Sequence, residues 1–594
     1  MKIRISPTAL CVALMAAGSV FQLRQYLACR SLWIDEANLA VHVVTRSASQ
    51  LLDPLASPQA DQFEGLNTKI VPLGFLMTVK ALTPVLGTSE YALRFLPLMA
   101  SLCSLPLFWG LARRRLSPWI VPGAVALLSL NWWLIRHCDN FKAYTMDVLM
   151  SIVVLWTADL YRHGRLRPLG FTLIGLLLPW FSFPCVFPLA GLGVCMMASH
   201  LRDRDWKQAR QLAWTGCVWL AGLLLLYLGT LGDVSDNQYL ADFWRKAFMP
   251  PLFGKGCGAW LKQAFWQFTD FAVSDTRSAG RFLPALRWGL AILMGIAVAG
   301  LWRKDRQWLG LLLLPAAFAL LASLLHVYPF AGRLSMFLIP IAILLLSAGV
   351  ETIASLRPRV FLPLTMALWG ILLWHPAKAR LHDLATPRTM EEIRPLMEIL
   401  HTGRHSHEPV YVYYAAVPAA TYYRERMGTP DQGFIPGIQS RKDRRRYLQD
   451  LNALKGHRRV WVLFSHMFKK EEPFMVAHLE TLGRRLAVFR EPANPGSRRG
   501  CPMGVAPCGS QPQEQTAPTS AGVDESRNLR GRVVGWLLFP SEAGPRLRPE
   551  CGSPRGTGPA QDDNVRKPPR QQQPDNLVQT ACQQSPLPGT PLGG

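Results

Sequence analysis

Charged side chains are scarce in this chain, at 17% of 594 residues, whereas hydrophobic residues make up 50%. Soluble domains carry about 25% charged residues, so the composition excludes an ordinary soluble protein. The mean hydropathy of +0.14 is nevertheless lower than membrane spans alone would give. The mixture predicts a bundle of membrane-spanning helices with water-exposed parts attached.

Cysteine spacings typical of metal sites are also missing. None of the 12 cysteines forms a CxxC pair or pairs with histidine at ligand spacing. Several of them, such as Cys11, Cys103 and Cys185, lie inside apolar runs, where cysteine acts as a small hydrophobic residue. The sequence therefore predicts neither a structural zinc site nor a disulfide framework.

Acidic residues are few, 39 against 64 basic ones, which gives a net charge of +25. Such a charge alone suggests a nucleic-acid partner. The basic residues, however, occur in short clusters between apolar runs, such as "ARRR", "YRHGRLR" and "WRKDRQ". In membrane proteins such clusters mark cytoplasmic loops, and no groove-reading motif accompanies them. We therefore expect no nucleic-acid binding.

The apolar runs predict about eleven spans, each near the length that a bilayer requires. The first, "MKIRISPTALCVALMAAGSVFQL", resembles a signal peptide but has no small-residue cleavage site, so we expect an uncleaved span. The others lie near 92–112, 117–135, 143–160, 169–183, 184–199, 211–231, 283–301, 308–325, 334–350 and 360–375.

One further apolar run, 70–87, contains Lys80 and two prolines. If it crosses the membrane, the cluster Arg113–Arg115 falls outside, against the positive-inside rule. If it is only partly embedded, every basic cluster lies on the cytoplasmic side. We therefore predict a cytoplasmic N-terminus, and an outer face that carries 24–91, 136–142, 232–282, 326–333 and everything after 376.

The remainder of the chain divides into two parts. Residues 376–490 contain strand-like runs, "PVYVYYA", "RVWVLFS" and "RLAVFRE", between helical patterns, which suggests a small α/β domain with three parallel strands. Residues 491–594 are rich in proline, glycine and glutamine, which predicts disorder. The predicted fold is thus an α-helical multi-pass membrane domain over 1–375, an extracytoplasmic α/β domain over 376–490 and a disordered tail.

Ionisable residues near the predicted outer surface are the candidates for chemistry. A carboxylate can act as a general base, and Arg and Lys can hold a phosphate leaving group. Together they suit transfer of a group from a lipid phosphate. Each also has an ordinary structural explanation, as a helix-start acid, a snorkelling arginine or a surface ion pair. The candidates are the acids Asp35, Glu36 and Asp139, and the phosphate-binding residues Lys142, Arg333, Arg136 and Tyr144.

Four strings resemble the GT-C superfamily of polyprenyl-phosphate-dependent glycosyltransferases, in the branch of protein O-mannosyltransferases and the lipid A aminoarabinose transferase. They are "LWIDEA", "LGTSEYALRFLP", "RHCDNFKAYTMD" and "YPFAGRLSMFLIP". The pattern GxSExxxRxxP, from Gly87 to Pro97, is the most specific of them. The resemblance covers residues 1–375. The chain reads "EGLNTKIVPLG" where relatives have a proline-rich "HPPL", so the resemblance leaves the acceptor undefined.

The resemblance implies an inverting transfer of sugar from a polyprenyl-monophosphate donor to an extracytoplasmic acceptor. Asp35 matches the presumed base and Asp139 the second acid, while Lys142 and Arg333 would contact the phosphate. It implies a bacterial inner-membrane protein whose active site is on the outer face. A divalent cation is left open. Three alternatives also stay open: a transporter or flippase, a polymerase or ligase acting on lipid-linked glycans, and a non-catalytic scaffold.

Overall fold

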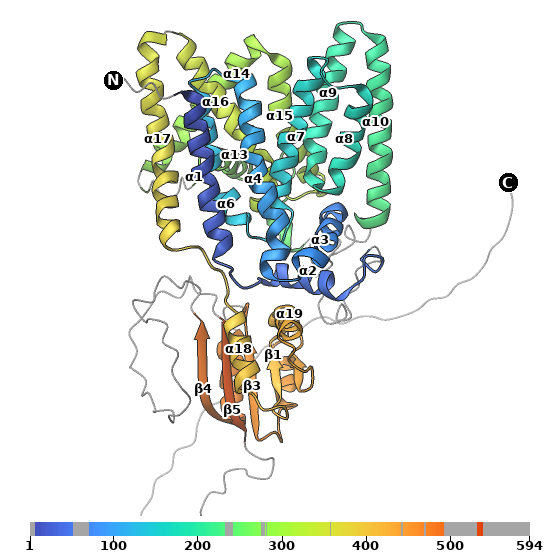
Figure 1. Cartoon of the computed structure of the whole chain (residues 1–594), viewed down its shortest axis with the longest axis vertical. Helices are drawn as coiled ribbons and strands as arrows, with labels where there is room; N and C mark the ends of the chain where they lie inside the picture. The colour runs from blue at the N-terminus through green and yellow to red at the C-terminus, as the bar shows by residue number, and fades with distance from the viewer. Residues whose placement is uncertain are drawn as a thin grey trace, which may run out of the picture. The chain divides into compact units, whose positions relative to one another are not determined.

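The structure of the chain, a computed structural model, describes residues 6–51, 71–231, 242–274, 280, 282–356, 358–440, 443–467, 471–491 and 531–538. Helices predominate up to Ala385, and a small sheet follows (Figure 1). Among the described residues, 7 helices are long and apolar enough to cross a membrane, which confirms the predicted helical multi-pass class. They are α1 (Pro7–Leu27), α4 (Glu90–Arg115), α9 (Val186–Arg202), α10 (Trp206–Leu226), α14 (Leu283–Lys304), α15 (Arg306–Leu324) and α16 (Ile339–Leu356).

The other four predicted runs are helical as well. They form α5 (Val121–Ser129) with α6 (Trp132–His137), α7 (Tyr144–Arg162), α8 (Pro168–Leu177) and α17 (Pro358–Ala385). The run predicted at 117–135 breaks because the Asn131 side chain accepts hydrogen bonds from the N–H groups of Trp133 and Leu134, which starts α6. The α5 helix is consequently only 9 residues long. Within the described ranges, seven of the eleven predicted runs thus form helices that are long and apolar enough to cross a membrane.

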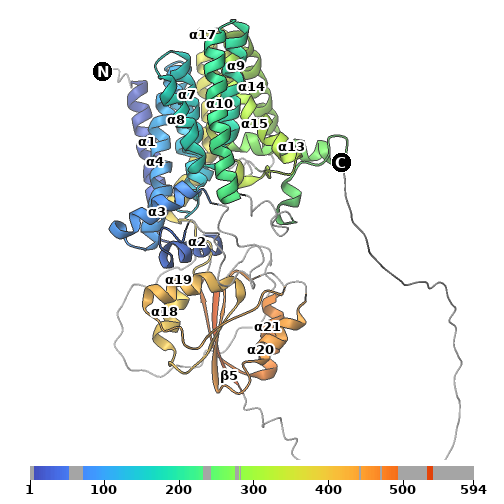
Figure 2. The same ribbon diagram turned by 90° about the vertical axis from the view of Figure 1, so that its right-hand side faces the viewer.

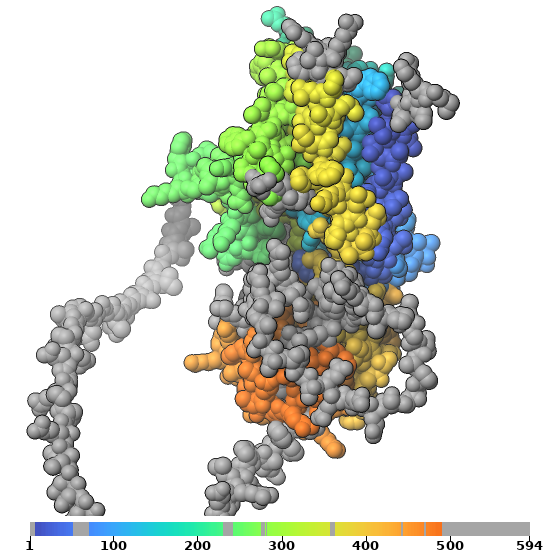
Figure 3. Space-filling view, turned by 90° about the vertical axis from the view of Figure 1, so that its left-hand side faces the viewer, coloured from blue at the N-terminus to red at the C-terminus, as the bar shows by residue number. Residues whose placement is uncertain are grey.

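Apolar side chains face outward along the bundle, as a lipid environment requires. On α17 these include Leu364, Ile371 and Trp374, which are 52%, 60% and 65% exposed. Figure 3 shows the surface of α17 beside that of α1. In water such a surface would be an aggregation hazard, whereas in a bilayer it contacts acyl chains.

The α1 helix finishes and α4 begins at the same end of the bundle, because the Tyr26 hydroxyl donates to the Tyr91 carbonyl at 2.7 Å. We call this the α2 end, since α2 (Ile34–Thr45) lies there together with α3 (Leu73–Leu86) (Figure 1). The α3 helix has 14 residues, fewer than a span requires, as expected for the run 70–87.

Basic clusters gather at the opposite end of the bundle. Arg114 and Arg115, in the last turn of α4, both pair with Asp159. Arg162 pairs with Asp305 at 3.1 Å. These contacts join the ends of α4 and α7 to the start of α15.

The sheet contains five strands in the order β2-β1-β3-β5-β4. Its parallel part is β2 (Phe434–Pro436), β1 (Val410–Val412) and β3 (Arg459–Phe464). In Figure 2, α18 (Arg394–Gly403) and α19 (Val417–Met427) lie to one side of the strands. On the other side lie α20 (Arg445–Asn452) and α21 (Glu471–Leu482). This arrangement buries Val410, Val460 and Val462.

Two features of the sheet differ from the prediction. The third parallel strand is β2, whereas the predicted strand "RLAVFRE" lies in β4 (Gly483–Glu491), which is antiparallel to its neighbour. That neighbour is β5 (Gly531–Leu538), which pairs with both β3 and β4. It falls in the stretch 491–594, whose composition predicts disorder. Its sequence "GRVVGWLL" is a local β-branched and apolar run within a polar composition. The other residues of that stretch after Glu491 lie outside the described ones.

Candidate active site

The carboxylate of Glu36 is enclosed at the α2 end, where the residue is 1% exposed. It accepts hydrogen bonds from Arg30 at 2.8 Å, from Arg94 at 3.0 Å and from the N–H of Phe141 at 2.7 Å. Burial alone would raise the pKa of Glu36, but the charges of Arg30 and Arg94 hold it at about 2. The Glu36 carboxylate is thus already engaged by two guanidinium groups and a backbone N–H, and its catalytic role stays a prediction.

Asp139 belongs to the same enclosed network and is 1% exposed. Its Oδ2 accepts hydrogen bonds from Gln25 Nε2 and Arg30 Nε, both at 3.0 Å. Arg30 thus bridges Asp139 and Glu36. This position fixes the turn that carries Lys142 against the start of α2, and it keeps Asp139 behind the accessible surface.

Asp35 points in a different direction from its neighbour Glu36, because successive helical residues are rotated by about 100°. Its side chain remains 27% exposed and pairs with Arg333 Nη2 at 3.0 Å. The Arg333 guanidinium lies over the ring of Trp33, 5.3 Å from its centroid, and over that of Tyr144 at 5.5 Å. The structure thus brings Asp35, Arg333 and Tyr144 together from three distant parts of the sequence.

Lys142 lies close to this group. Burial lowers the pKa of Lys142 from its ordinary value of 10.5, and the Asp35 carboxylate opposes that change by favouring the ammonium. Arg136 lies further aside, with its guanidinium 4.9 Å from the centroid of the Trp132 ring. Of the predicted phosphate ligands, Lys142, Arg333 and Tyr144 surround Asp35, whereas Arg136 stacks elsewhere.

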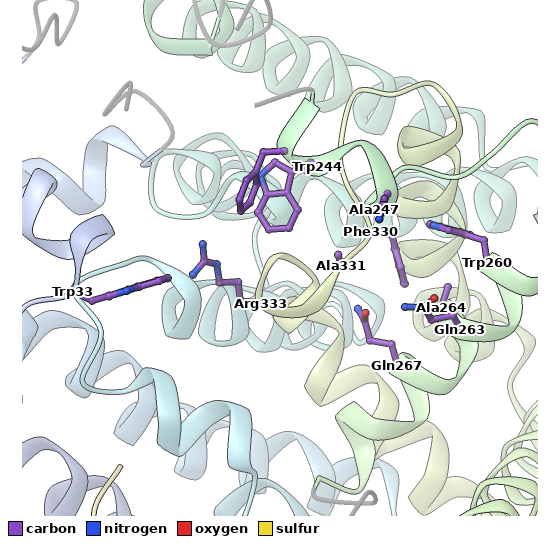
Figure 4. A pocket seen from close by; sticks show the side chains of 12 residues that line it. Trp33, Trp244, Ala247, Trp260, Gln263, Ala264, Gln267, Phe330, Ala331 and Arg333 are labelled. Carbon is purple, nitrogen blue, oxygen red and sulfur yellow. The ribbon is translucent and has the colours of Figure 1, made fainter. Parts of the chain in front are cut away.

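A cavity of about 490 Å³ opens beside the Asp35–Arg333 pair. Such a volume is typical of small-ligand sites. Its lining runs from Trp33 and Arg333 at one side to Trp260 and Gln263 at the other (Figure 4). Trp244 and Trp260 come from the aromatic segment 232–282, whose residues 232–241, 275–279 and 281 lie outside the described ones.

Polar groups occur within this aromatic lining. Gln263 and Gln267 belong to α13 (Cys257–Ala272), and Lys246 also lines the cavity. The Gln267 Nε2 is buried and has no hydrogen-bond partner among the described residues. Aromatic faces with a few amide and cationic groups suit a ligand that combines apolar and polar surfaces.

The sequence pattern GxSExxxRxxP has a structural meaning. The Ser89 hydroxyl accepts a hydrogen bond from the Ala92 N–H and so caps α4. One turn apart on that helix, Glu90 pairs with Arg394 and Arg426, while Arg94 binds Glu36. The pattern therefore clamps the α2 end of the bundle to α18 and α19.

Several residues of the site were not predicted. Arg30 and Arg94 organise the acids, and Trp33 forms the wall beside Arg333. Arg94 lies within the pattern GxSExxxRxxP, Trp33 lies within "SLWIDEA", and Arg30 directly precedes that string. Their position in or next to these two motifs was the only sequence signal that could have identified them. In the described parts of the chain, no group of three or more His, Cys, Asp or Glu residues could hold a metal ion.

No protein-family model and no curated protein sequence matches the chain. Solved structures with a similar fold include ArnT from Cupriavidus metallidurans in the apo state, with 11% identity and a TM-score of 0.48 over 88% of this chain and 97% of that one. The same protein bound to undecaprenyl phosphate gives 12% identity and a TM-score of 0.45, over 90% and 99% of the two chains. The Archaeoglobus fulgidus oligosaccharyltransferase, with zinc and sulfate, gives 12% and 0.43, over 76% and 67%. At identities this low, the roles of residues in those proteins cannot be assigned to residues of this chain.

Proposed function

We propose that the chain is an integral-membrane glycosyltransferase that moves a sugar from a polyprenyl-monophosphate donor to an extracytoplasmic acceptor. One observation carries this proposal: a partly exposed carboxylate, Asp35, is paired with Arg333, which lines an aromatic cavity at the α2 end of the bundle. A general base, a phosphate ligand and a site for an amphiphilic ligand are thereby adjacent.

The proposed reaction is a single displacement. Asp35 takes the proton from an acceptor hydroxyl or amine while that atom forms a bond to the anomeric carbon of the sugar. The bond between this carbon and the phosphate oxygen breaks, and polyprenyl phosphate leaves with the electron pair. One displacement inverts the anomeric centre. Arg333 and Lys142 stabilise the charge that develops on the leaving phosphate.

The pair of Asp35 with Arg333 has a consequence for the order of events. Arg333 engages the Asp35 carboxylate in an ion pair at 3.0 Å. A donor phosphate competes with this carboxylate for the same guanidinium. Arg binds phosphate strongly because the two groups can form two parallel hydrogen bonds. Donor binding therefore frees Asp35 to act as a base only when a substrate is present.

We further propose that Asp35 faces the outside of a bacterial inner membrane. The arginine clusters at the end opposite α2 support this orientation, because basic loops remain in the cytoplasm. In intact cells that carry the chain with its 12 native cysteines replaced by serine, we expect an impermeant maleimide to label Ser49→Cys, which lies on the exposed surface after α2. The matched variant Lys207→Cys, exposed at the other end, should react only after permeabilisation. The opposite pattern would reverse the orientation and remove the donor from reach of Asp35.

The function itself is tested by what accumulates in source cells that lack the chain. We expect a polyprenyl-monophosphate sugar to build up in their membranes and to disappear when the gene is restored, as measured by mass spectrometry of lipid extracts. A build-up of diphosphate-linked glycan would instead identify a polymerase or ligase. An unchanged lipid-linked sugar pool would reject the glycosyltransferase.

A further inference from the structure

His466 is held in an unusual backbone conformation beside the candidate active site. It lies two residues after the end of β3, with φ of 55°. The backbone of a residue other than glycine rarely adopts this left-handed conformation. Such strain persists only where the surrounding structure enforces it. Strained residues of this kind concentrate at functional sites.

The imidazole of His466 contacts the wall of the cavity. Trp33 Nε1–H donates to His466 Nδ1 at 3.1 Å, and the two rings meet edge to face with centroids 5.6 Å apart. An indole N–H can only donate, so Nδ1 serves it as an acceptor. The contact fixes the plane of the indole.

The loop that carries His466 is tied to the linker that precedes α18, because the Ser465 hydroxyl donates to Glu391 Oε2 at 3.0 Å. Glu391 Oε1 lies 3.0 Å from the same Nδ1 that faces Trp33. Nδ1 either donates to this carboxylate or accepts from the indole, and only the form without a proton on Nδ1 accepts from Trp33. Glu391 is 4% exposed. A buried carboxylate thus holds the loop after β3 in place.

The orientation of Trp33 matters because its ring supports Arg333. The guanidinium lies 5.3 Å from the centroid of the indole, and Arg333 in turn pairs with Asp35. A rotation of the indole would move the cation that faces the donor phosphate. The contacts therefore connect His466, Trp33, Arg333 and Asp35 in series.

We propose that His466 is a positioning residue for sugar transfer: it holds Trp33, and through Trp33 the Arg333 guanidinium, in the position from which it binds the donor phosphate. This inference rests on the proposed function. It gives the segment after α17 a role in the chemistry, because a loop of its sheet contacts Trp33, which lines the cavity. Transfer is then efficient only while that segment is docked at the α2 end.

The test compares three substitutions at this contact. His466→Gly accepts the left-handed backbone but offers no acceptor to Trp33. His466→Asn tolerates the same backbone and keeps an acceptor oxygen close to the position of Nδ1. Trp33→Phe removes the donor of this hydrogen bond. The matched control is His478→Ala, in α21, whose Nε2 lies 3.0 Å from Asn452 Oδ1 and which does not line the cavity.

The variants are expressed in cells without the native copy, and the membranes of these cells are isolated. Donor lipid extracted from cells that lack the chain altogether is added, and its consumption is followed. We expect His466→Gly to lower kcat by about 10²-fold, the loss typical of a misplaced reacting group, with a smaller change in KM for donor. His466→Asn should recover most of the rate. Once Trp33 is Phe, His466→Gly should add no further loss.

Each outcome supports or overturns the positioning role. The role is overturned if His466→Gly has the kcat of the wild type. It is also overturned if the kcat of His466→Asn is no higher than that of His466→Gly. A loss of the same size in His478→Ala also overturns it, because the effect would then be general. Wild-type membranes that consume no donor reject the proposed function, and this inference falls with it.

Discussion

Replacement of Asp35 by Asn is expected to lower kcat for sugar transfer by about 10²- to 10⁴-fold, the range lost with a general base. The amide oxygen can still accept the hydrogen bond from Arg333, so the wall of the cavity remains in place. The amide cannot take a proton from the acceptor. We therefore expect the loss in kcat, with a KM for donor that is no higher than in the wild type because the neutral amide competes less for Arg333, in membranes supplied with the accumulated donor.

The matched control is Asp270→Asn. Asp270 forms a comparable pair with Arg287, at 3.6 Å and with side chains 21% and 24% exposed. This pair does not line the cavity. A transfer rate near that of the wild type is expected for Asp270→Asn. If Asp35→Asn performs equally well, another group is the base and the displacement cannot begin at Asp35.

Much of the fold follows from local properties of the sequence. The apolar runs became helices because a bilayer requires satisfied backbone groups over about 20 residues. The break at Asn131 was not predicted. An asparagine in an apolar run can either lie inside a continuous span or cap a new helix, and here its side chain caps α6. The β5 strand was missed for a different reason: composition averaged over 491–594 conceals one short apolar run.

The site was less predictable than the fold. Asp35 and Glu36 are adjacent and chemically similar. Which of them is buried depends only on the face of α2 that packs against the bundle. The partners that create this difference are remote in sequence: Arg94 is 58 residues from Glu36, and His466 is 433 residues from Trp33. A single sequence carries no signal for such pairings, whereas the hydrophobic periodicity of a helix is local.

Glu36→Gln should have a large effect on stability. It leaves Arg30 and Arg94 buried without their shared counter-charge, and removal of one partner of a buried ion pair costs about 3–5 kcal/mol. We expect a clearly lower midpoint of thermal unfolding in detergent, together with reduced amounts of chain in membranes. Glu398→Gln is the control, because its pair with Arg394 spans 4.0 Å and its side chain is 59% exposed. Surface pairs contribute about 0–1 kcal/mol, so that midpoint should hardly change.

The same carboxylate predicts how acid destabilises the protein. The pKa of Glu36 is about 2 in the folded chain, below its ordinary value of 4.5, because Arg30 and Arg94 outweigh the effect of burial. A depressed pKa means that this contribution to stability is complete above pH 4.5 and is lost as the pH falls toward 2. The unfolding midpoint of the wild type should therefore drop through this window more steeply than that of Glu36→Gln. Parallel curves for the two proteins would show that the pKa of Glu36 is the same in the folded and unfolded chain, so that Arg30 and Arg94 do not depress it.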